Sequence, residues 1–282
     1  MSEPRLGVVG AGTMGAGIAQ VCATAGLQVV MVDVGLEQLQ RGQQTIAGSL
    51  ARLEAKQKLP RPATEISGRI HTSTSVSDLG RVDLVIEAAF EDLAVKSDLF
   101  RKLDGACKPE AILASNTSSI SITRLAAATK RPAKVVGMHF MNPVPVMGHV
   151  ELIRGLETSD ATMETARELA TRLGKIAVES GDSPGFIANR VLMPMINEAV
   201  FALAEGVGTV DAIDTMLRGL NFPMGPLALA DLIGLDVCLA ILEVLQRDFG
   251  DPKYRPAPLL RQYVAAGRLG RKSGRGFHEY AE

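Results

Sequence analysis

LGVVGAGTMG, residues 6–15, joins a short apolar run to a glycine-rich turn and to the start of a helical stretch. Gly10 permits a tight turn, Gly12 lets the backbone approach a pyrophosphate, and Gly15 allows a helix to pack closely on a strand. Phosphates are expected at the N-terminus of that helix, where free N–H groups point outward. The stretch therefore predicts a strand, turn and helix that bind a dinucleotide, with Thr13 and Met14 also among the cofactor-binding residues.

A carboxylate follows at the position that such a site needs. Asp33 ends the next strand-like run, Gln28–Asp33, 18 residues after Gly15, where it can accept hydrogen bonds from both hydroxyls of a ribose. Neither Val34 nor Gly35 supplies a cation for a 2′-phosphate, so NAD is favoured over NADP. A glycine-rich hairpin with an incidental aspartate is the alternative, and the order of strand, turn, helix, strand and acid weighs against it. FAD-binding proteins share the fingerprint, so the catalytic residues must decide between the two cofactors.

The rest of the chain indicates two domains. Strand-like runs alternate with helical stretches such as Leu93–Cys107 and Ile120–Thr129 as far as Pro184. This alternation predicts an α/β fold, a Rossmann-like doubly wound, mainly parallel sheet covered on both faces. After Pro184 only helical stretches remain, so we expect residues 1–184 to form the dinucleotide-binding domain and residues 185–282 an all-helical one. The expected elements of the two parts, beyond those already named, are strands at Leu6–Gly10, Val82–Ala88, Ala111–Ser115, Lys134–Phe140, Val150–Arg154 and Lys175–Glu179, and helices at Thr13–Ala25, Leu36–Lys58, Gly185–Gly206, Thr209–Gly219 and Leu227–Phe249.

Composition and charge exclude several classes of protein. A net charge of -1 gives no reason to expect a nucleic-acid or anionic membrane partner, and 46% apolar residues suffice for a sizeable core. The uncharged stretch from Leu6 to Val32 is interrupted by glycines and polar residues, so it is not read as a membrane span. The three cysteines, Cys22, Cys107 and Cys238, have no paired spacing, which predicts buried thiols in a cytoplasmic protein and no metal site.

The segment GMHFMNPVPVMGHVEL, residues 137–152, predicts an acid/base pair. His139 lies six residues before Pro145 and Glu151 six residues after it, so a chain that turns back at Pro145 brings the two side chains together. A carboxylate that holds one ring nitrogen leaves the other nitrogen to act on a substrate. His149 is a rival, because it lies two residues from Glu151 on the same face of a regular strand. His71 and His278 are interpreted as hydrogen-bonded packing residues.

A second polar segment, ASNTSSISI at residues 114–122, ends a strand in small hydroxyl and amide side chains. Ligands of doubly wound sheets lie beyond the carboxyl ends of the strands, so Asn116 or Ser118 can donate a hydrogen bond to a substrate or a nicotinamide. The alternative is structural, since Ser118 or Ser119 can cap the helical stretch that follows. The residues alone leave both readings open.

Several motifs together resemble the 3-hydroxyacyl-CoA dehydrogenase family, most closely its bacterial members that act on 3-hydroxybutyryl-CoA. They span nearly the whole chain in the family's order, and the pattern HF-x-NP-x-P-x-M followed by V-E is highly specific. Met141 stands where the family more often has a second phenylalanine, and Arg271 and Arg275 differ mildly from its usual tail. The motifs are GAGTMGAGIA, VIEAAFEDLAVK, ASNTSSISI, GMHFMNPVPVM with VELI, DSPGFIANRVL, GLNFPMGPLALADLIGLD and GRKSGRGF.

The resemblance implies a role for each matched residue. It makes His139 the base and Glu151 its partner, demotes His149, and gives Ser118 the contact to the substrate hydroxyl. Asn189 becomes a further active-site amide, and the helical domain a homodimer interface. By the same match Glu91, Lys96, Asn142 and Lys272 contact the dinucleotide, and Asn116 and Ser118 are counted with them from their place after the strand. Ser49 and Lys56 match contacts to coenzyme A, although a solvated helix face is the plainer reading of both.

The expected activity is hydride transfer between NAD and C3 of a short 3-hydroxyacyl-CoA. The substrate hydroxyl is held by Ser118 and His139, and His139 removes its proton. A sugar-acid dehydrogenase of the gulonate type on the same scaffold is the alternative enzyme. An inactive NAD-binding structural protein is the non-enzymatic alternative, and the presence of Ser118, His139, Glu151 and Asn189 together argues against it.

Overall fold

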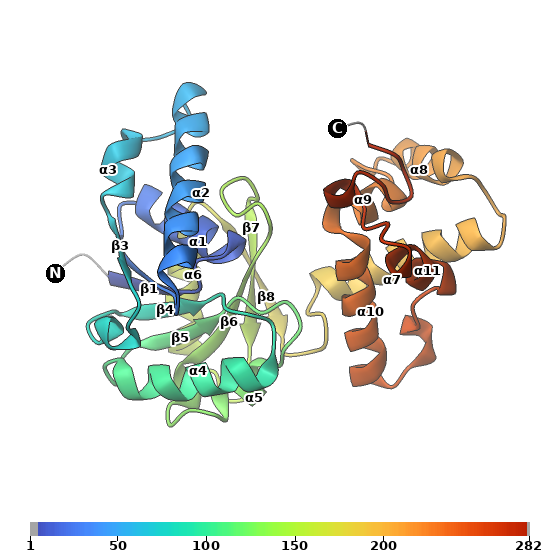
Figure 1. Ribbon diagram of the computed structural model, residues 1–282. Helices are drawn as coiled ribbons and strands as arrows, with labels where there is room; N and C mark the ends of the chain where they lie inside the picture. The colour runs from blue at the N-terminus through green and yellow to red at the C-terminus, as the bar shows by residue number, and fades with distance from the viewer. Residues whose placement is uncertain (1–4, 281–282) are drawn as a thin grey trace. The chain divides into compact units, whose positions relative to one another are not determined.

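A computed structural model describes residues 5–280 of the chain, which divide between Ser183 and Pro184 into two units. The first unit is built on a sheet of eight described strands in the order β3-β2-β1-β4-β5-β6-β7-β8 (Figure 1). Its strands are β1 (Arg5–Val9), β2 (Gln28–Val32), β3 (Ile70–Ser73), β4 (Leu84–Glu87), β5 (Ile112–Ser115), β6 (Val135–Phe140), β7 (His149–Arg154) and β8 (Ile176–Gly181). All neighbouring strands run parallel except β6 and β7, which are antiparallel.

Helices lie on both faces of this sheet, so its central strands are buried on both sides. Every residue of β4, β5 and β6 is buried, the pattern expected of a parallel sheet between two helical layers. Figure 1 shows α4 and α5 on the face opposite α1 and α2. The helices of the unit are α1 (Thr13–Thr24), α2 (Leu36–Ala55), α3 (Ala63–Ser67), α4 (Leu93–Ala106), α5 (Ile122–Ala126) and α6 (Asp160–Arg172), with short 3₁₀ turns η1 (Val76–Leu79) and η2 (Pro132–Lys134). The predicted fold class is confirmed.

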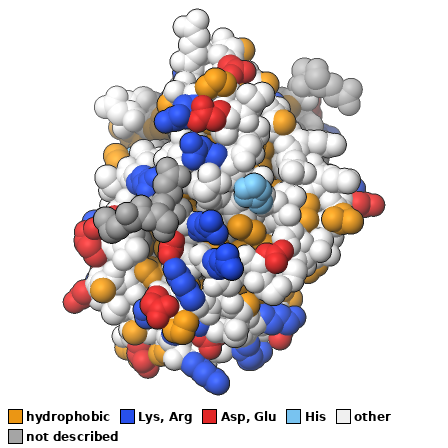
Figure 2. Space-filling model, turned by 90° about the vertical axis from the view of Figure 1, so that its left-hand side faces the viewer, with side chains coloured by type: hydrophobic (Ala, Val, Ile, Leu, Met, Phe, Trp, Pro, Cys, Tyr) orange, Lys and Arg blue, Asp and Glu red, His pale blue; other side chains and the backbone are white. Residues whose placement is uncertain are grey.

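The edge strand β3 was not predicted, because its residues lack an apolar pattern. Only its ends are partly buried, and His71 and Thr72 between them are exposed. Figure 2 shows that Lys and Arg side chains gather on the side of the molecule where β3 lies. Charges around an edge strand discourage pairing with another chain, which is consistent with so polar a sequence at this place.

The second unit consists of helices. Its elements are α7 (Ala188–Ala204), α8 (Val210–Gly219), α9 (Pro226–Ile233), α10 (Leu235–Phe249), η3 (Pro252–Tyr254), α11 (Pro258–Ala265) and η4 (Arg271–Ser273). Met193, Leu227, Leu242 and Leu260 belong to its own apolar core. No helix among residues 5–280 has the length and apolar character that crossing a membrane requires.

Two predicted helix bounds in this unit need correction. The stretch Leu227–Phe249 is two helices, because Gly234 between them has φ +107°, outside the helical region. The first helix begins at Ala188 and not at Gly185, where φ is +76°. Thr209 caps α8 as expected, since its side chain accepts a hydrogen bond from the N–H of Ala212.

Candidate active site

The glycine-rich turn has a separate steric reason for each glycine. A Cβ on Gly15 would lie 1.8 Å from the carbonyl oxygen of Gly10, so α1 approaches β1 more closely than any side chain permits. Gly10 has φ +102°, and a Cβ there would lie 2.5 Å from the carbonyl oxygen of Ala88. Gly12 has no atom within 4 Å of such a Cβ, so the space beside it is open. Two glycines therefore shape the turn, and the third leaves room for a ligand.

The helix that follows presents its backbone N–H groups without a side-chain cap. Gly12 is the N-cap residue of α1 and makes no side-chain hydrogen bond, and the first turn holds no acidic residue. The first N–H groups of a helix have no partner within the helix, and the N-terminus carries a partial positive charge. Thr13 is exposed and Met14 half-buried beside them. The turn is therefore suited to a pyrophosphate.

Asp33 is oriented by the same turn. One of its oxygens, Oδ2, accepts a hydrogen bond of 2.7 Å from the N–H of Ala11, and the side chain is only partly buried. Its other oxygen, Oδ1, lies 3.5 Å from the N–H of Gly35. The carboxylate keeps lone pairs for further donors. The exposed Val34 beside it carries no charge, so a ribose with free hydroxyls suits this place better than a phosphorylated one.

A buried ion pair occupies the carboxyl ends of β4 and β5. Glu87 is fully buried and accepts hydrogen bonds from Lys96 Nζ (2.5 Å), Ser115 Oγ (2.6 Å) and the N–H of Ala89 (2.7 Å). Lys96, 1% exposed, also lies 3.3 Å from Glu91 Oε2. A charge pair in such surroundings persists only when its remaining hydrogen-bonding capacity is also satisfied, as it is here.

Glu91 holds the loop that carries Ser118. Its Oε1 accepts hydrogen bonds from Thr117 Oγ1 (2.5 Å), the N–H of Ser118 (3.1 Å) and Ser119 Oγ (3.3 Å). Glu91, a residue expected at the dinucleotide, therefore also fixes the backbone at Ser118, and Lys96 contacts this carboxylate.

The capping alternative for Ser118 and Ser119 is wrong. The N-cap of α5 is Ser121, whose side chain accepts a hydrogen bond from the N–H of Arg124. Asp182 completes that cap by accepting hydrogen bonds from the N–H groups of Ile122 (2.9 Å) and Thr123 (2.8 Å). Neither serine is needed to cap the helix.

His139 and Glu151 face each other across the antiparallel pair of strands. They are direct partners in the register of β6 and β7, and His139 Nδ1 lies 2.8 Å from Glu151 Oε2. Both are buried, with 8% and 5% of their surface exposed. His149 lies at the exposed start of β7, so burial favours His139. The turn around Pro145 thus joins the two residues that the sequence pairs.

Two asparagines lie at the same edge of the sheet. Asn116 follows β5, and its Oδ1 accepts a hydrogen bond of 2.9 Å from the N–H of Phe140 at the end of β6. It therefore links the Ser118 loop to the strand of His139. Asn142 lies in the loop after β6 and is exposed. The carboxyl ends of the parallel neighbours β5 and β6 meet here, so Ser118, Asn116 and His139 lie at the same edge of the sheet.

The two residues expected at coenzyme A lie on α2. Ser49 is half-buried within the helix, and Lys56 is exposed at its C-cap. Their spacing of seven residues is about two helical turns, which places both on one side of the helix.

Asn189 and Lys272 lie in the second unit and are described there by themselves. Asn189 is buried in the first turn of α7. Lys272 forms an ion pair of 2.7 Å with Asp236, so its ammonium already has a carboxylate partner.

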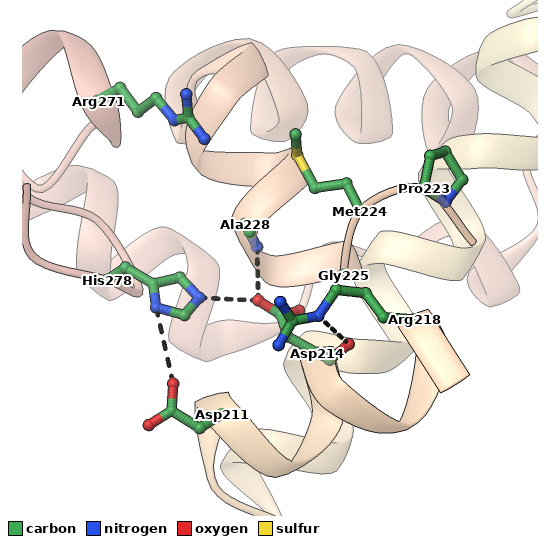
Figure 3. A pocket seen from close by; sticks show the side chains of 9 residues that line it. All are labelled: Asp211, Asp214, Arg218, Pro223, Met224, Gly225, Ala228, Arg271 and His278. Carbon is green, nitrogen blue, oxygen red and sulfur yellow. Dashed lines mark hydrogen bonds and ion pairs between the residues drawn. The ribbon is translucent and has the colours of Figure 1, made fainter. Parts of the chain in front are cut away.

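His278 lines a pocket of about 290 Å³ in the second unit (Figure 3). His278 Nε2 lies 2.7 Å from Oδ2 of the buried Asp214, which also accepts hydrogen bonds from the N–H groups of Leu227 (2.8 Å) and Ala228 (3.0 Å) at the start of α9. Asp211 lies 3.9 Å from the other ring nitrogen. The histidine ties the C-terminal segment to Asp214, in keeping with the packing role expected of it.

Sequence reasoning missed Glu87 and Ser115. The only signal for Glu87 was a carboxylate at the end of the buried run LVIE, residues 84–87. A charge at the end of a fully buried strand requires a partner, and that partner is Lys96, nine residues later. No spacing rule pairs these residues, because the intervening turn sets their approach.

Fold and site together define a dinucleotide-dependent oxidoreductase with a histidine–carboxylate pair. Residues 5–183 match the model of the 3-hydroxyacyl-CoA dehydrogenase NAD binding domain, and residues 185–280 match that of the C-terminal domain. The chain belongs to the 3-hydroxyacyl-CoA dehydrogenase family.

Several relatives are similar to this chain over all or nearly all of their length. It is 54% identical over 277 residues to a probable 3-hydroxybutyryl-CoA dehydrogenase of Deinococcus radiodurans, covering 98% of this chain and 100% of the relative. It is also 54% identical over 278 residues to the 3-hydroxybutyryl-CoA dehydrogenase of Bradyrhizobium diazoefficiens, covering 98% and 95%. The crystal structure of (S)-3-hydroxybutyryl-CoA dehydrogenase from Ralstonia eutropha superposes with a TM-score of 0.95 at 53% identity, covering 100% of both chains.

Proposed function

We propose that this protein catalyses the reversible, NAD-dependent oxidation of 3-hydroxybutyryl-CoA to acetoacetyl-CoA. The observation that carries the proposal is the buried His139–Glu151 pair, joined at 2.8 Å, at the edge of the sheet that bears the glycine-rich turn. Full-length relatives with this activity in their names support the choice of substrate.

The residues present fit NAD. The open space beside Gly12, the uncapped start of α1 and the carboxylate of Asp33 suit the pyrophosphate and the ribose in turn. When bound, NAD accepts a hydride from C3 of the substrate. The protein supplies the binding surface and handles the proton.

His139 takes the proton of the 3-hydroxyl in the oxidative direction. An ionised carboxylate has no hydrogen to donate, so Nδ1–H donates to Glu151 and the lone pair of the neutral ring is on Nε2. Nε2 accepts the proton, and Glu151 stabilises the imidazolium that forms. In the reductive direction the protonated ring returns that proton to the ketone oxygen.

The neighbouring polar groups hold the substrate and the cofactor. Ser118 donates to the 3-hydroxyl oxygen, and its backbone is fixed by Glu91. Asn116, Asn142, Glu91 and Lys96 would contact the dinucleotide. By the family match, Asn189 would be a further active-site amide and Lys272 a dinucleotide contact.

Coenzyme A is bound by α2. Lys56 is exposed and lies on the same side of the helix as Ser49. An ammonium and a hydroxyl are therefore available to a phosphate of the coenzyme. A short pantetheine thioester lacks that phosphate. Lys56→Ala is therefore expected to weaken acetoacetyl-CoA binding about tenfold and to leave the pantetheine thioester nearly unchanged.

The helical unit forms a homodimer, and the protein works in the cytoplasm. Exposed apolar side chains on the helical unit, among them Val191, Met216, Leu220 and Leu232, support the dimer. Three cysteines without disulfides support a reducing compartment. Sedimentation at micromolar concentration tests the dimer, and a monomer would contradict it.

The decisive experiment is the absorbance of NADH at 340 nm with acetoacetyl-CoA as substrate. We expect saturable oxidation of NADH and weaker activity with NADPH. Reduction of NAD by a sugar acid such as gulonate, without turnover of the thioester, would favour the alternative enzyme. NAD binding without turnover of either substrate would favour a structural protein.

A further inference from the structure

A single lysine fastens the loop between the two strands of the acid/base pair. This loop, Met141–Gly148, begins two residues after His139, ends three before Glu151 and carries Asn142. Its own hydrogen bonds are few: the N–H groups of Val146 and Met147 both point to the carbonyl oxygen of Pro143, at 3.0 Å. The loop therefore needs external contacts to keep one shape.

Lys175, the residue before β8, supplies the most specific of these contacts. Its Nζ donates hydrogen bonds to the carbonyl oxygens of Val144 and Met147, each at 2.6 Å. Burial lowers the pKa of this ammonium. Two carbonyl oxygens that converge on one point require a group with at least two N–H donors, which an ammonium provides.

The loop is also packed against the helix of the dinucleotide turn. Val144 is 2% exposed, and a Cβ added to Gly17 of α1 would lie 2.9 Å from the Cβ of Val144. At the other end the N–H of Ile176 donates to the carbonyl oxygen of Gly148, at 2.8 Å. The loop thus contacts α1 through Val144 and the start of β8 through Gly148, next to Lys175.

We infer that Lys175 is a positioning residue for cofactor binding, although it belongs to neither the cofactor set nor the acid/base pair. It holds the loop that carries Asn142 and that packs against Gly17 of α1, and the inference rests on the proposed dehydrogenase function. The two hydrogen bonds from Lys175 to the loop are called the Lys175 clamp. The pairing of His139 with Glu151 depends on the strand pairing of β6 and β7 and not on this clamp. Loss of the clamp therefore affects the fit of the dinucleotide more than the proton transfer.

The test compares Lys175→Met with Lys175→Arg and with the control Lys134→Met. Lys134 also donates to a backbone carbonyl, that of Glu110 at 3.3 Å, but lies outside the loop. Misplacing a binding group by about 1 Å can cost up to about a hundredfold. We expect Lys175→Met to raise the KM for NADH about tenfold or more, with a smaller change in kcat. The pH at half-maximal kcat should not move, because it reports the acid/base pair.

Lys175→Arg keeps two donors and is expected to recover part of the affinity, while Lys134→Met behaves as wild type. A KM for NADH within twofold of wild type in folded Lys175→Met would overturn the inference, as would an equal rise in Lys134→Met. If the methionine variant does not fold, Lys175→Ala, which also has no side-chain donor, replaces it under the same criterion. If the wild type does not reduce acetoacetyl-CoA, the proposed function fails, and the Kd of NADH for the same variants still tests the clamp.

Discussion

The hydrogen bond from His139 to Glu151 couples two side chains into one chemical unit. Because Glu151 accepts a hydrogen bond from Nδ1–H of His139, it fixes the orientation of the ring. It thereby also fixes which ring nitrogen exchanges protons. Both groups are buried, so the protein and not water balances the charge that forms on the imidazole. Residues that act as one unit give non-additive losses when they are removed together.

This coupling predicts the outcome of a double-mutant cycle. His139→Asn removes the base but keeps a polar side chain, so kcat is expected to fall about 10²–10⁴-fold with NAD binding little changed. Glu151→Gln keeps the size but loses the charge, and should also lower kcat. The double mutant should be hardly slower than His139→Asn alone. Steady-state kinetics with acetoacetyl-CoA measures all three.

His149→Leu is the matched control, because His149 lies on the same strand as Glu151 but is exposed. Its kcat is expected to stay within a few-fold of wild type. Losses that multiply in the double mutant would exclude the unit, and a collapse of activity in His149→Leu would mean that the wrong histidine had been assigned.

Asp33 is expected to govern the choice between NAD and NADP. Asp33→Ala removes the acceptor for ribose hydroxyls, one of which is already phosphorylated in NADP. A hydrogen bond to a charged group contributes about 1.5–3 kcal/mol, so the KM for NAD should rise about 10–150-fold and that for NADP much less. Asp33→Asn is a useful companion, because its amide oxygen can still accept from the N–H of Ala11. Equal effects of Asp33→Ala on both cofactors would refute the assignment.

At the scale of elements, the glycine-rich stretch 10–15 at the junction of β1 and α1 contains one glycine needed for packing and another expected to border the cofactor. Gly15→Ala places a Cβ 1.8 Å from the Gly10 carbonyl oxygen and should lower the free energy of unfolding by about 1–3 kcal/mol or more. Gly12→Ala meets no atom of the protein, so its stability should stay within about 0.5 kcal/mol of wild type. Its methyl group occupies the space expected for a pyrophosphate.

Urea unfolding and NAD titration distinguish the two variants. Gly12→Ala is expected to bind NAD about tenfold more weakly or worse, equivalent to about 1.4 kcal/mol, at unchanged stability. Tight NAD binding by this variant would show that the phosphates lie elsewhere.

The sequence predicted the central strands, whose apolar runs match their burial. β1, β4, β5 and β6 are apolar runs buried on both faces, and the structure has strands at all four. The polar edge strand β3 carries no such pattern and went unrecognised. The break at Gly234 was missed because one glycine within an apolar helical stretch is often tolerated.

The site was predictable where its contacts are local and not where they are distant. The turn around Pro145 indicated the pairing of His139 with Glu151, 12 residues apart. Glu87 with Ser115, 28 residues apart, and Lys175 with Val144, 31 residues apart, depend on crossovers between elements, and no local pattern encodes them. Roles for Asn189 and Lys272 came only from the resemblance to a family and remain predictions.

At the scale of the whole molecule, the three cysteines report on the two units separately. Burial raises the pKa of Cys22, in the first unit, and of Cys238, in the second, to about 12 from the usual 9.0. Burial also raises the pKa of Cys107, in the first unit, although the charge of Arg131 opposes it. A raised pKa leaves less of the reactive thiolate, here about a thousandfold less for Cys22 and Cys238 at pH 8.

We therefore expect the native protein to resist a thiol reagent at pH 8. In urea, Cys22 and Cys107 should become labelled with one midpoint, because both are buried in the same unit, and Cys238 reports the helical unit independently. Pulse labelling followed by mass spectrometry of peptides makes the measurement. Rapid labelling of Cys22 without urea, or different midpoints for Cys22 and Cys107, would contradict the burial described here.

The antiparallel pairing of β6 and β7 also affects the order in which the contacts of the site form during folding. Antiparallel neighbours can be joined by a short turn, whereas parallel neighbours need a long crossover. Each doubling of the length of a flexible loop adds about 0.6 kcal/mol to the entropic cost of closing it, and contacts distant along the chain form more slowly. His139 and Glu151 meet through a hairpin, whereas Glu87 and Ser115 meet only after a crossover through α4. Nascent chains can thus bring the base and its carboxylate together by local closure, before the surrounding parallel sheet is complete.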